Sequence, residues 1–266
     1  MPVAELIRYF NAADTAGDST LYVADQRVEA WHAGLRLGSL FQPIVDLRSE
    51  RIVGHQASLA ARHENGTPAS GQAAYAHCES PAAVVHFDRL CRTLHALNFL
   101  TQRRHAGGYL QLPVHTRHLQ AVPNQHGLVY EAILKRCGLA PQDIVLQVDA
   151  SALASEPDQL QRALANYRQR GYRLAVLGDS PGRDLRPDII QYPSPPAAGE
   201  IPPGVLSEII EIDNGAAYLA ARQAGAALGQ GQLFGTAQAD CRPTHDPRRV
   251  AYNSPILFGE SHENRQ

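Results

Sequence analysis

Glutamines, rather than acids or nucleophiles, are the side chains of this sequence best placed to act together. Gln42, Gln56 and Gln147 each lie within a short apolar run, and Gln230 lies just beyond the last helical pattern. A carboxamide donates and accepts hydrogen bonds, but it has no charge with which to hold a metal ion strongly. These residues therefore indicate ligand binding or internal hydrogen bonding rather than acid and base catalysis.

Two histidines are the other candidates for chemistry. His115 and His118 are three residues apart and would share one face of a helix, but no third metal ligand lies beside them. We therefore expect a solvated or capping role for both. His55 precedes Gln56 and is expected to face the opposite side of its strand, as a core or helix-packing residue. The Asp-Ser-Pro-Gly segment at 179–182 is predicted to be a turn, because no histidine stands near its serine.

Composition indicates one large cytoplasmic domain. The chain has 266 residues, 44% of them hydrophobic, which suits a single barrel-sized unit. Its formal charge is -2, so a nucleic-acid partner is not expected. The cysteines at 78, 91, 137 and 241 form no CxxC pair and are predicted to be buried, inert thiols in a reducing compartment. Neither a signal peptide nor a membrane span is predicted.

Alternating strand and helix patterns predict an α/β fold. Most of the apolar runs are continuous, as expected for parallel strands buried on both faces. The predicted strands are 40–47, 52–59, 109–114, 144–148, 173–177, 188–192 and 206–212. The predicted helices are 82–103, 128–137, 157–170 (with Ser155 as N-cap and Gly171 as the stop) and 216–228. The number of repeats favours a TIM-like (β/α) barrel, with an open doubly wound sheet as the alternative.

The ends of the chain and one connection depart from this alternation. Residues 193–204 are too rich in proline and glycine for a helix, so one outer helix is predicted to be replaced by an irregular loop. Amphipathic stretches in residues 1–38 are predicted to form a helical segment that packs on the barrel. The barrel is assigned to 39–238, and residues 239–266 are predicted to be an irregular C-terminal tail.

Several short motifs, taken in order, resemble the EAL family of cyclic di-GMP phosphodiesterases. The most specific is Leu-Phe-Gln-Pro-Ile-Val-Asp-Leu at 40–47, followed by Arg-Ile-Val-Gly at 51–54, which resembles the first hairpin of that family. Weaker matches follow in the family's order at 87–89, 116–119, 138–141, 171–175, 187–188, 225 and 230–231. The resemblance covers roughly residues 40–238 and implies a barrel of the EAL type.

The resemblance also implies that the catalytic residues have been lost. Hydrolysis in the family uses two divalent cations held by carboxylates. The Glu-Ala-Leu signature is matched by Gln-Ala-Ser at 56–58, a ligand asparagine by Pro113, two glutamates by Gln147 and Ala150, and the catalytic lysine by Gln191. Asp179 is at most one retained aspartate, and Glu211 or Asp213 would stand near a further lost acid. We therefore predict no magnesium or manganese cofactor and no catalytic residue.

Two interpretations of the glutamines and three of the function follow. Gln42, Gln56, Gln147 and Gln230, with Asp179, would contact the nucleotide if cyclic di-GMP binds; otherwise the glutamines belong to the framework of the barrel mouth. The favoured function is an inactive EAL-like regulator that binds another protein, with or without cyclic di-GMP as a modulator. A weakly active phosphodiesterase that releases the linear dinucleotide is the alternative, and an unrelated barrel enzyme is the third class. The oligomeric state stays open, although homodimers are common in the family.

Overall fold

The structure is a computed structural model that describes residues 3–13, 20–121, 128–151, 157–178, 186–197 and 200–243. Asp179, the predicted turn at 179–182, the predicted N-cap Ser155 and the tail from residue 244 lie outside these ranges. Among the helices of the described residues, none is both long enough and apolar enough to cross a membrane.

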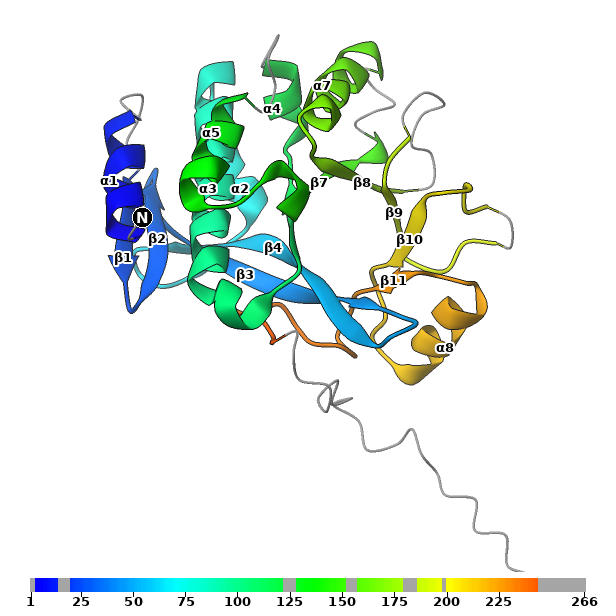
Figure 1. The fold of residues 1–266 in the computed structure, drawn as a ribbon. Helices are drawn as coiled ribbons and strands as arrows, with labels where there is room; N and C mark the ends of the chain where they lie inside the picture. The colour runs from blue at the N-terminus through cyan, green and yellow to red at the C-terminus, as the bar shows by residue number, and fades with distance from the viewer. Residues whose placement is uncertain are drawn as a thin grey trace, which may run out of the picture.

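Eight of the described strands close into a barrel (Figure 1). Their order is β3 (Leu35–Asp46), β11 (Leu228–Gly229), β10 (Leu206–Ile209), β9 (Ile189–Tyr192), β8 (Arg173–Leu177), β7 (Ile144–Asp149), β6 (Tyr109–Pro113) and β4 (Arg51–His63). The pairing of β3 with β4 closes the ring. Neighbours are parallel, except that β3 runs antiparallel to both β4 and β11. The predicted α/β barrel is confirmed.

Helices cover the barrel unevenly. They are α2 (Gly71–Ala76), α3 (Pro81–Ala106), α4 (Thr116–Ala121), α5 (Leu128–Cys137), α7 (Pro157–Gln169) and α8 (Gly215–Gln223), with a short 3-10 turn at Pro141–Asp143. Figure 1 shows α3, α5 and α7 around β6, β7 and β8, and α8 beside β10 and β11. The prediction of a helix over 216–228 was wrong beyond Gln223, because Gly225, with φ of 77°, ends the helix and Leu228 starts β11.

The connection between β9 and β10 has no helix among its described residues, as the proline and glycine content predicted. The connection between β8 and β9 is also short, since β8 ends at Leu177 and β9 begins at Ile189. Its described residues are not helical either, although 179–185 lie outside the description. The helix α7 is therefore the last helix described before α8.

The N-terminal segment was predicted to be helical, and this was wrong for residues 20–38. After α1 (Val3–Ala13), the chain forms a hairpin of β1 (Thr20–Ala24) and β2 (Arg27–His32), which pairs with the start of β3. Asp25 and Gln26 have φ of 48° and 64°, which makes the tight hairpin turn. Burial alternates along these strands with period two, and β3 runs without a break through the predicted boundary at 38–39.

The hairpin is fastened to α3 by buried side-chain hydrogen bonds. The amide of Asn98 accepts a bond from the backbone N–H of Val28 (2.9 Å) and donates to its carbonyl (2.7 Å). Asn98 also donates to Ser39, whose hydroxyl lies 2.8 Å from Nδ1 of His95. All these side chains are buried. A short β5 (Pro68–Ala69) extends the sheet beyond β4 on the other side.

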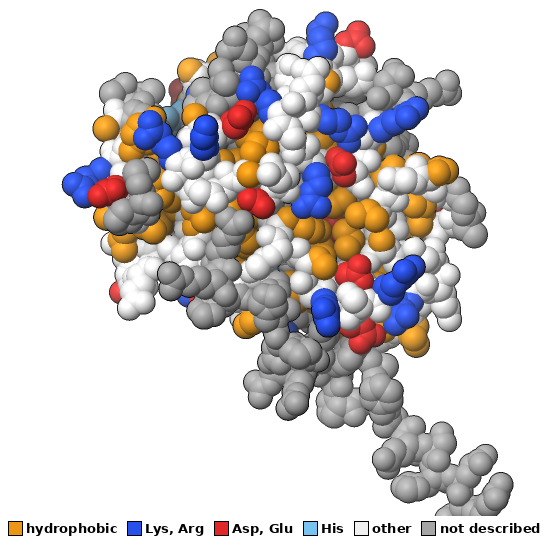
Figure 2. Space-filling view, viewed as in Figure 1, with side chains coloured by type: hydrophobic (Ala, Val, Ile, Leu, Met, Phe, Trp, Pro, Cys, Tyr) orange, Lys and Arg blue, Asp and Glu red, His pale blue; other side chains and the backbone are white. Residues whose placement is uncertain are grey.

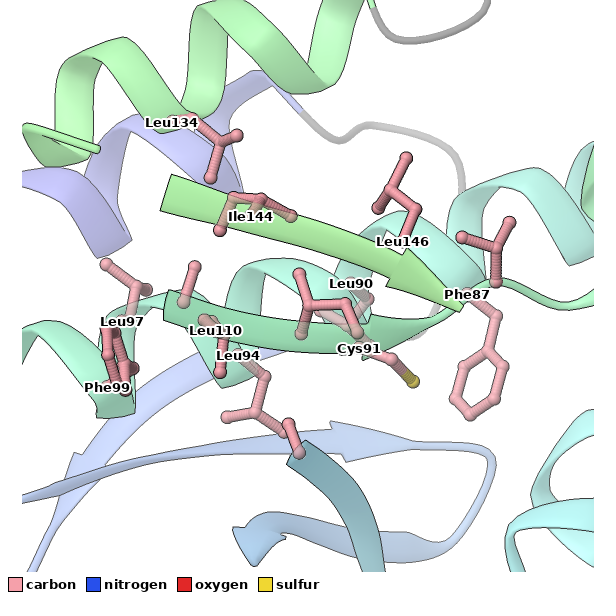
Figure 3. Packing of buried hydrophobic residues seen from close by; sticks show 14 of the residues in the cluster. Phe87, Leu90, Cys91, Leu94, Leu97, Phe99, Leu110, Leu134, Ile144 and Leu146 are labelled. Carbon is pink, nitrogen blue, oxygen red and sulfur yellow. The ribbon is translucent and has the colours of Figure 1, made fainter. Parts of the chain in front are cut away.

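The main apolar core lies between the outer face of the strands and the helices. Figure 3 shows Leu90, Leu94 and Leu97 of α3 packed near Leu110 of β6 and Ile144 of β7. The predicted buried thiols are part of this packing, and all four cysteines are free. On the outer surface drawn in Figure 2, basic, acidic and apolar side chains are intermingled.

The first residues of the predicted tail dock against the barrel. Gln238 pairs with Phe41 of β3, and Gln102 of α3 bonds the backbone of Ala239 and Cys241. The backbone N–H of Arg242 donates to Nε2 of His55 at 3.1 Å. Residues 239–243 are thus irregular but held in place by hydrogen bonds, and the rest of the predicted tail lies outside the described residues.

Candidate functional site

The interior of the barrel is apolar at one level. Every second residue of a strand faces inward, and the inward residues of six strands form a buried apolar cluster. These residues are Ile44, Tyr109, Val145, Ala175, Ile189 and Leu228. The intervening residues, such as Leu110 and Ile190, pack outward in the other clusters. This layer closes the interior toward the amino-terminal ends of the parallel strands.

A layer of glutamines lies one step closer to the carboxyl-terminal mouth. In five strands, the residue two positions from the apolar layer on the same face is a glutamine: Gln42, Gln111, Gln147, Gln191 and Gln230. Gln56 joins them from β4, where it pairs in register with Gln42 and with Gln111. Glu208 joins from β10 as the register partner of Gln191. Ligands of such barrels bind at this end of the strands.

The four predicted glutamines meet in two hydrogen-bonded pairs. Nε2 of Gln56 donates to Oε1 of Gln147 at 2.9 Å, across the strand that lies between them. Nε2 of Gln230 donates to Oε1 of Gln42 at 2.9 Å, and Gln42 donates in turn to the carbonyl of Gly235 at 3.1 Å. The tertiary structure therefore brings these four side chains together, and each uses at least one hydrogen bond within the framework.

Glu208 is the acid of this layer, and the sequence interpretation missed it. The side chain is completely buried, and burial raises the pKa of its carboxyl to about 7, although the hydrogen bond from Gln191 (3.0 Å) lowers it. The acids that sequence matching favoured, Glu211 and Asp213, are exposed. A glutamate within a predicted buried strand was the signal that could have identified it, because an acid is almost never fully buried without a partner.

Gln111 was missed for the same reason. It lies within the predicted strand 109–114 and is completely buried, yet neither its Oε1 nor its Nε2 has a hydrogen-bond partner. Oε1 of Gln191, Oε1 of Glu208 and the hydroxyl of Tyr109 are also buried without partners. The centre of the barrel is therefore polar and incompletely paired by the protein itself.

Other predicted residues lie elsewhere. His55 is buried against Phe99 as predicted, and burial lowers its pKa to about 4. His118 is not solvated, which corrects the prediction: it is buried with Nδ1 3.3 Å from Asp88, because α4 packs directly on α3. His115 is partly buried and stacks on Tyr75. Asp179 lies outside the described residues.

The fold and this layer define a closed (β/α) barrel with a polar interior at the carboxyl ends of its strands. The family model of the EAL domain matches residues 26–178, more than half of the chain. The chain therefore belongs to the EAL domain family. No curated protein sequence matches it.

Solved structures of EAL proteins share the fold at low sequence identity. A calcium and cyclic di-GMP complex of BlrP1 from Klebsiella pneumoniae has a TM-score of 0.62 at 17% identity, covering 76% of this chain and 56% of that one. The chain thus spans little more than half of that protein. The EAL domain of FimX from Pseudomonas aeruginosa, bound to cyclic di-GMP, has a TM-score of 0.65 at 13% identity over 91% of this chain and 99% of that one. A standalone EAL protein from Vibrio cholerae gives 0.58 at 17% identity, covering 80% and 96%.

The residues present do not fit the two divalent cations that the family resemblance implies. The amides of Gln56 and Gln147 bond each other, and Pro113 offers no side-chain oxygen. Asp149, at the end of β7, is exposed and accepts bonds from the N–H and hydroxyl of Ser151. Within the described residues, no group of three His, Cys, Asp or Glu side chains could hold a metal ion. One buried acid cannot offset the repulsion between two dications.

Proposed function

We propose that this EAL domain is a catalytically inactive module of cyclic di-GMP-linked signalling that regulates by binding another protein. The observation that carries this proposal is the 2.9 Å hydrogen bond between Gln56 and Gln147. Sequence matching places these two amides where the family has metal-binding glutamates. An amide pair bonded to itself leaves little capacity for a dication, and removing most ligands of a two-metal site abolishes its chemistry.

Cyclic di-GMP is proposed as a modulator rather than a substrate. Structures of related fold from Klebsiella and Pseudomonas hold this nucleotide. In this chain, Gln42 and Gln230 are bonded to each other, which supports a framework role for them. Nucleotide binding would then depend on Gln56 and Gln147, whose remaining amide atoms can donate to a phosphate or pair with a base edge.

A hydrolysis assay separates this proposal from a weakly active phosphodiesterase. The purified chain is incubated with cyclic di-GMP and Mg²⁺ or Mn²⁺, and the linear product is measured by chromatography. The matched control is a Gln56→Leu, Gln147→Leu double variant prepared in the same way, which reports contaminating activity. Equal, background-level product in both supports inactivity, whereas product formed only by the unaltered chain overturns it.

Binding is measured separately from metal chemistry. Calorimetry with cyclic di-GMP in excess EDTA tests whether the nucleotide binds without divalent cations; saturable heat that the double variant loses supports a modulator, and no heat restricts the proposal to protein binding. The protein-binding part is tested by affinity purification of the full chain from its own cells and reconstitution with the purified partner. A chain that stays alone under both conditions contradicts it. The proposal places the chain in the cytoplasm, in keeping with its four free thiols.

A further inference from the structure

The polar atoms at the centre of the barrel need a partner that the protein does not supply. Gln111, Gln191 and Glu208 are completely buried, and an Oε1 atom of each has no hydrogen-bond partner. Buried polar groups in folded proteins are paired in the great majority of cases, because an unpaired one loses its hydration without compensation. A species within the barrel must therefore contact these oxygens.

These oxygens converge because the barrel is narrow. Gln191 and Glu208 are register partners on adjacent strands, and their side chains are joined by a 3.0 Å hydrogen bond. Gln111 projects from β6, which lies on the opposite side of the eight-stranded ring from β10. The interior of such a barrel is just wide enough for side chains to fill, so inward residues of opposite strands meet near the axis. Tyr109, with its own unpartnered hydroxyl, faces the same interior from one step below.

The charge of the site is negative and uncompensated by the protein. Glu208 has no hydrogen-bonded or ion-paired cationic side chain in the part of the chain that the structure describes. Arg173, a cation at the end of a neighbouring strand, is directed at the ring of Tyr109, with its guanidinium carbon 4.6 Å from the ring centroid. A buried carboxylate is stable only when a counter-charge accompanies it.

We propose that the barrel binds one monovalent alkali cation, K⁺ or Na⁺, through the carboxylate of Glu208 and the carboxamide oxygens of Gln191 and Gln111. Neutral and anionic oxygens are the ligands of hard cations, and a single negative charge balances a single positive one. Divalent ions are disfavoured, because they need more carboxylates than this layer offers. The site lies within the barrel and is independent of nucleotide or protein binding at the mouth.

The first test measures stability against urea at pH 8 for the full chain in KCl, NaCl or choline chloride at equal ionic strength. K⁺ or Na⁺ is expected to stabilise the chain relative to choline, which is too large to enter. Each tenfold rise in the bound cation above its dissociation constant adds about 1.4 kcal/mol to the free energy of unfolding. Glu208→Gln should abolish the difference between salts, and Glu211→Gln, which changes an exposed acid beyond the same strand, should retain it.

The second test needs no variant. Crystals of the unaltered chain soaked in Tl⁺, a heavy substitute for K⁺, should show an anomalous peak within contact distance of Glu208 and the two carboxamide oxygens. Absence of that peak, with ordinary water density between these atoms instead, overturns the proposal. Equal stability in choline and in K⁺ or Na⁺ also overturns it.

Discussion

Replacing Glu208 by glutamine should change how the stability of the protein depends on pH. The carboxyl titrates with a pKa of about 7 in the folded chain, compared with an ordinary value of 4.5, because it is fully buried. Between these values the folded state binds more protons than the unfolded state, so this group makes stability fall as pH rises. The contribution is constant below pH 4.5 and above pH 7.

The size of the effect follows from the pKa. A difference of this size corresponds to about 3 kcal/mol of stability lost between pH 4.5 and pH 8. The carboxamide introduced by Glu208→Gln would be near-isosteric with the protonated acid and would not ionise, so this loss should vanish. The variant should therefore gain about 3 kcal/mol relative to the unaltered protein across that interval.

The assay is urea unfolding of both proteins at half-unit steps of pH, in choline buffers that contain no alkali cation. Other groups titrate in the same range: burial lowers the pKa of His55 and of His95 to about 4, so stability from these groups is lost as pH falls from 6.5 towards 4. Their contributions are the same in both proteins and cancel in the difference. Two stability curves that stay parallel from pH 4.5 to 8 would refute the reasoning.

Three further substitutions test the framework by urea unfolding. Asn98→Ala should destabilise the chain by about 2 to 4 kcal/mol, because it leaves a buried N–H and carbonyl of β2 unpaired; a loss below about 1 kcal/mol would contradict this. Asp88→Ala should destabilise by about 3 to 5 kcal/mol, since a completely buried guanidinium loses its carboxylate, and an unchanged midpoint would exclude that account. Gly231→Ala should destabilise by about 3 kcal/mol or more, because the added Cβ overlaps the backbone of Ile212 and φ is 154°. Gly38→Ala, where an added Cβ meets nothing within 4 Å, is its control.

Sequence patterns located most of the barrel because buried strands leave a local signature. The predicted strands at 109–114, 144–148 and 173–177 match β6, β7 and β8 within one residue. Continuous apolar runs of this kind persist whatever the neighbours are. The β1–β2 hairpin was misread as helical, because short amphipathic stretches satisfy either period and only tight turns with positive φ at Asp25 and Gln26 separate them.

The candidate site was only half accessible to the same reasoning. Gln42, Gln56, Gln147 and Gln230 were selected by sequence, and the structure brings them together as two bonded pairs. Matching to a family directs attention to positions where that family has functional residues. Gln111 and Glu208 stand at other positions, and no local pattern announces that their side chains share the interior.

The sequence by itself determined the class of fold, the family and the loss of charge at the metal-binding positions, because these depend on residue type and order along the chain. Only the tertiary structure decided that Glu208 is the buried acid, and that Glu211 and Asp213 are exposed. The physical reason is that a side chain's pKa and partners depend on which strands meet around it. In a closed barrel these are strands as distant in sequence as β6 and β10, and their separation is set by ring closure rather than by local spacing.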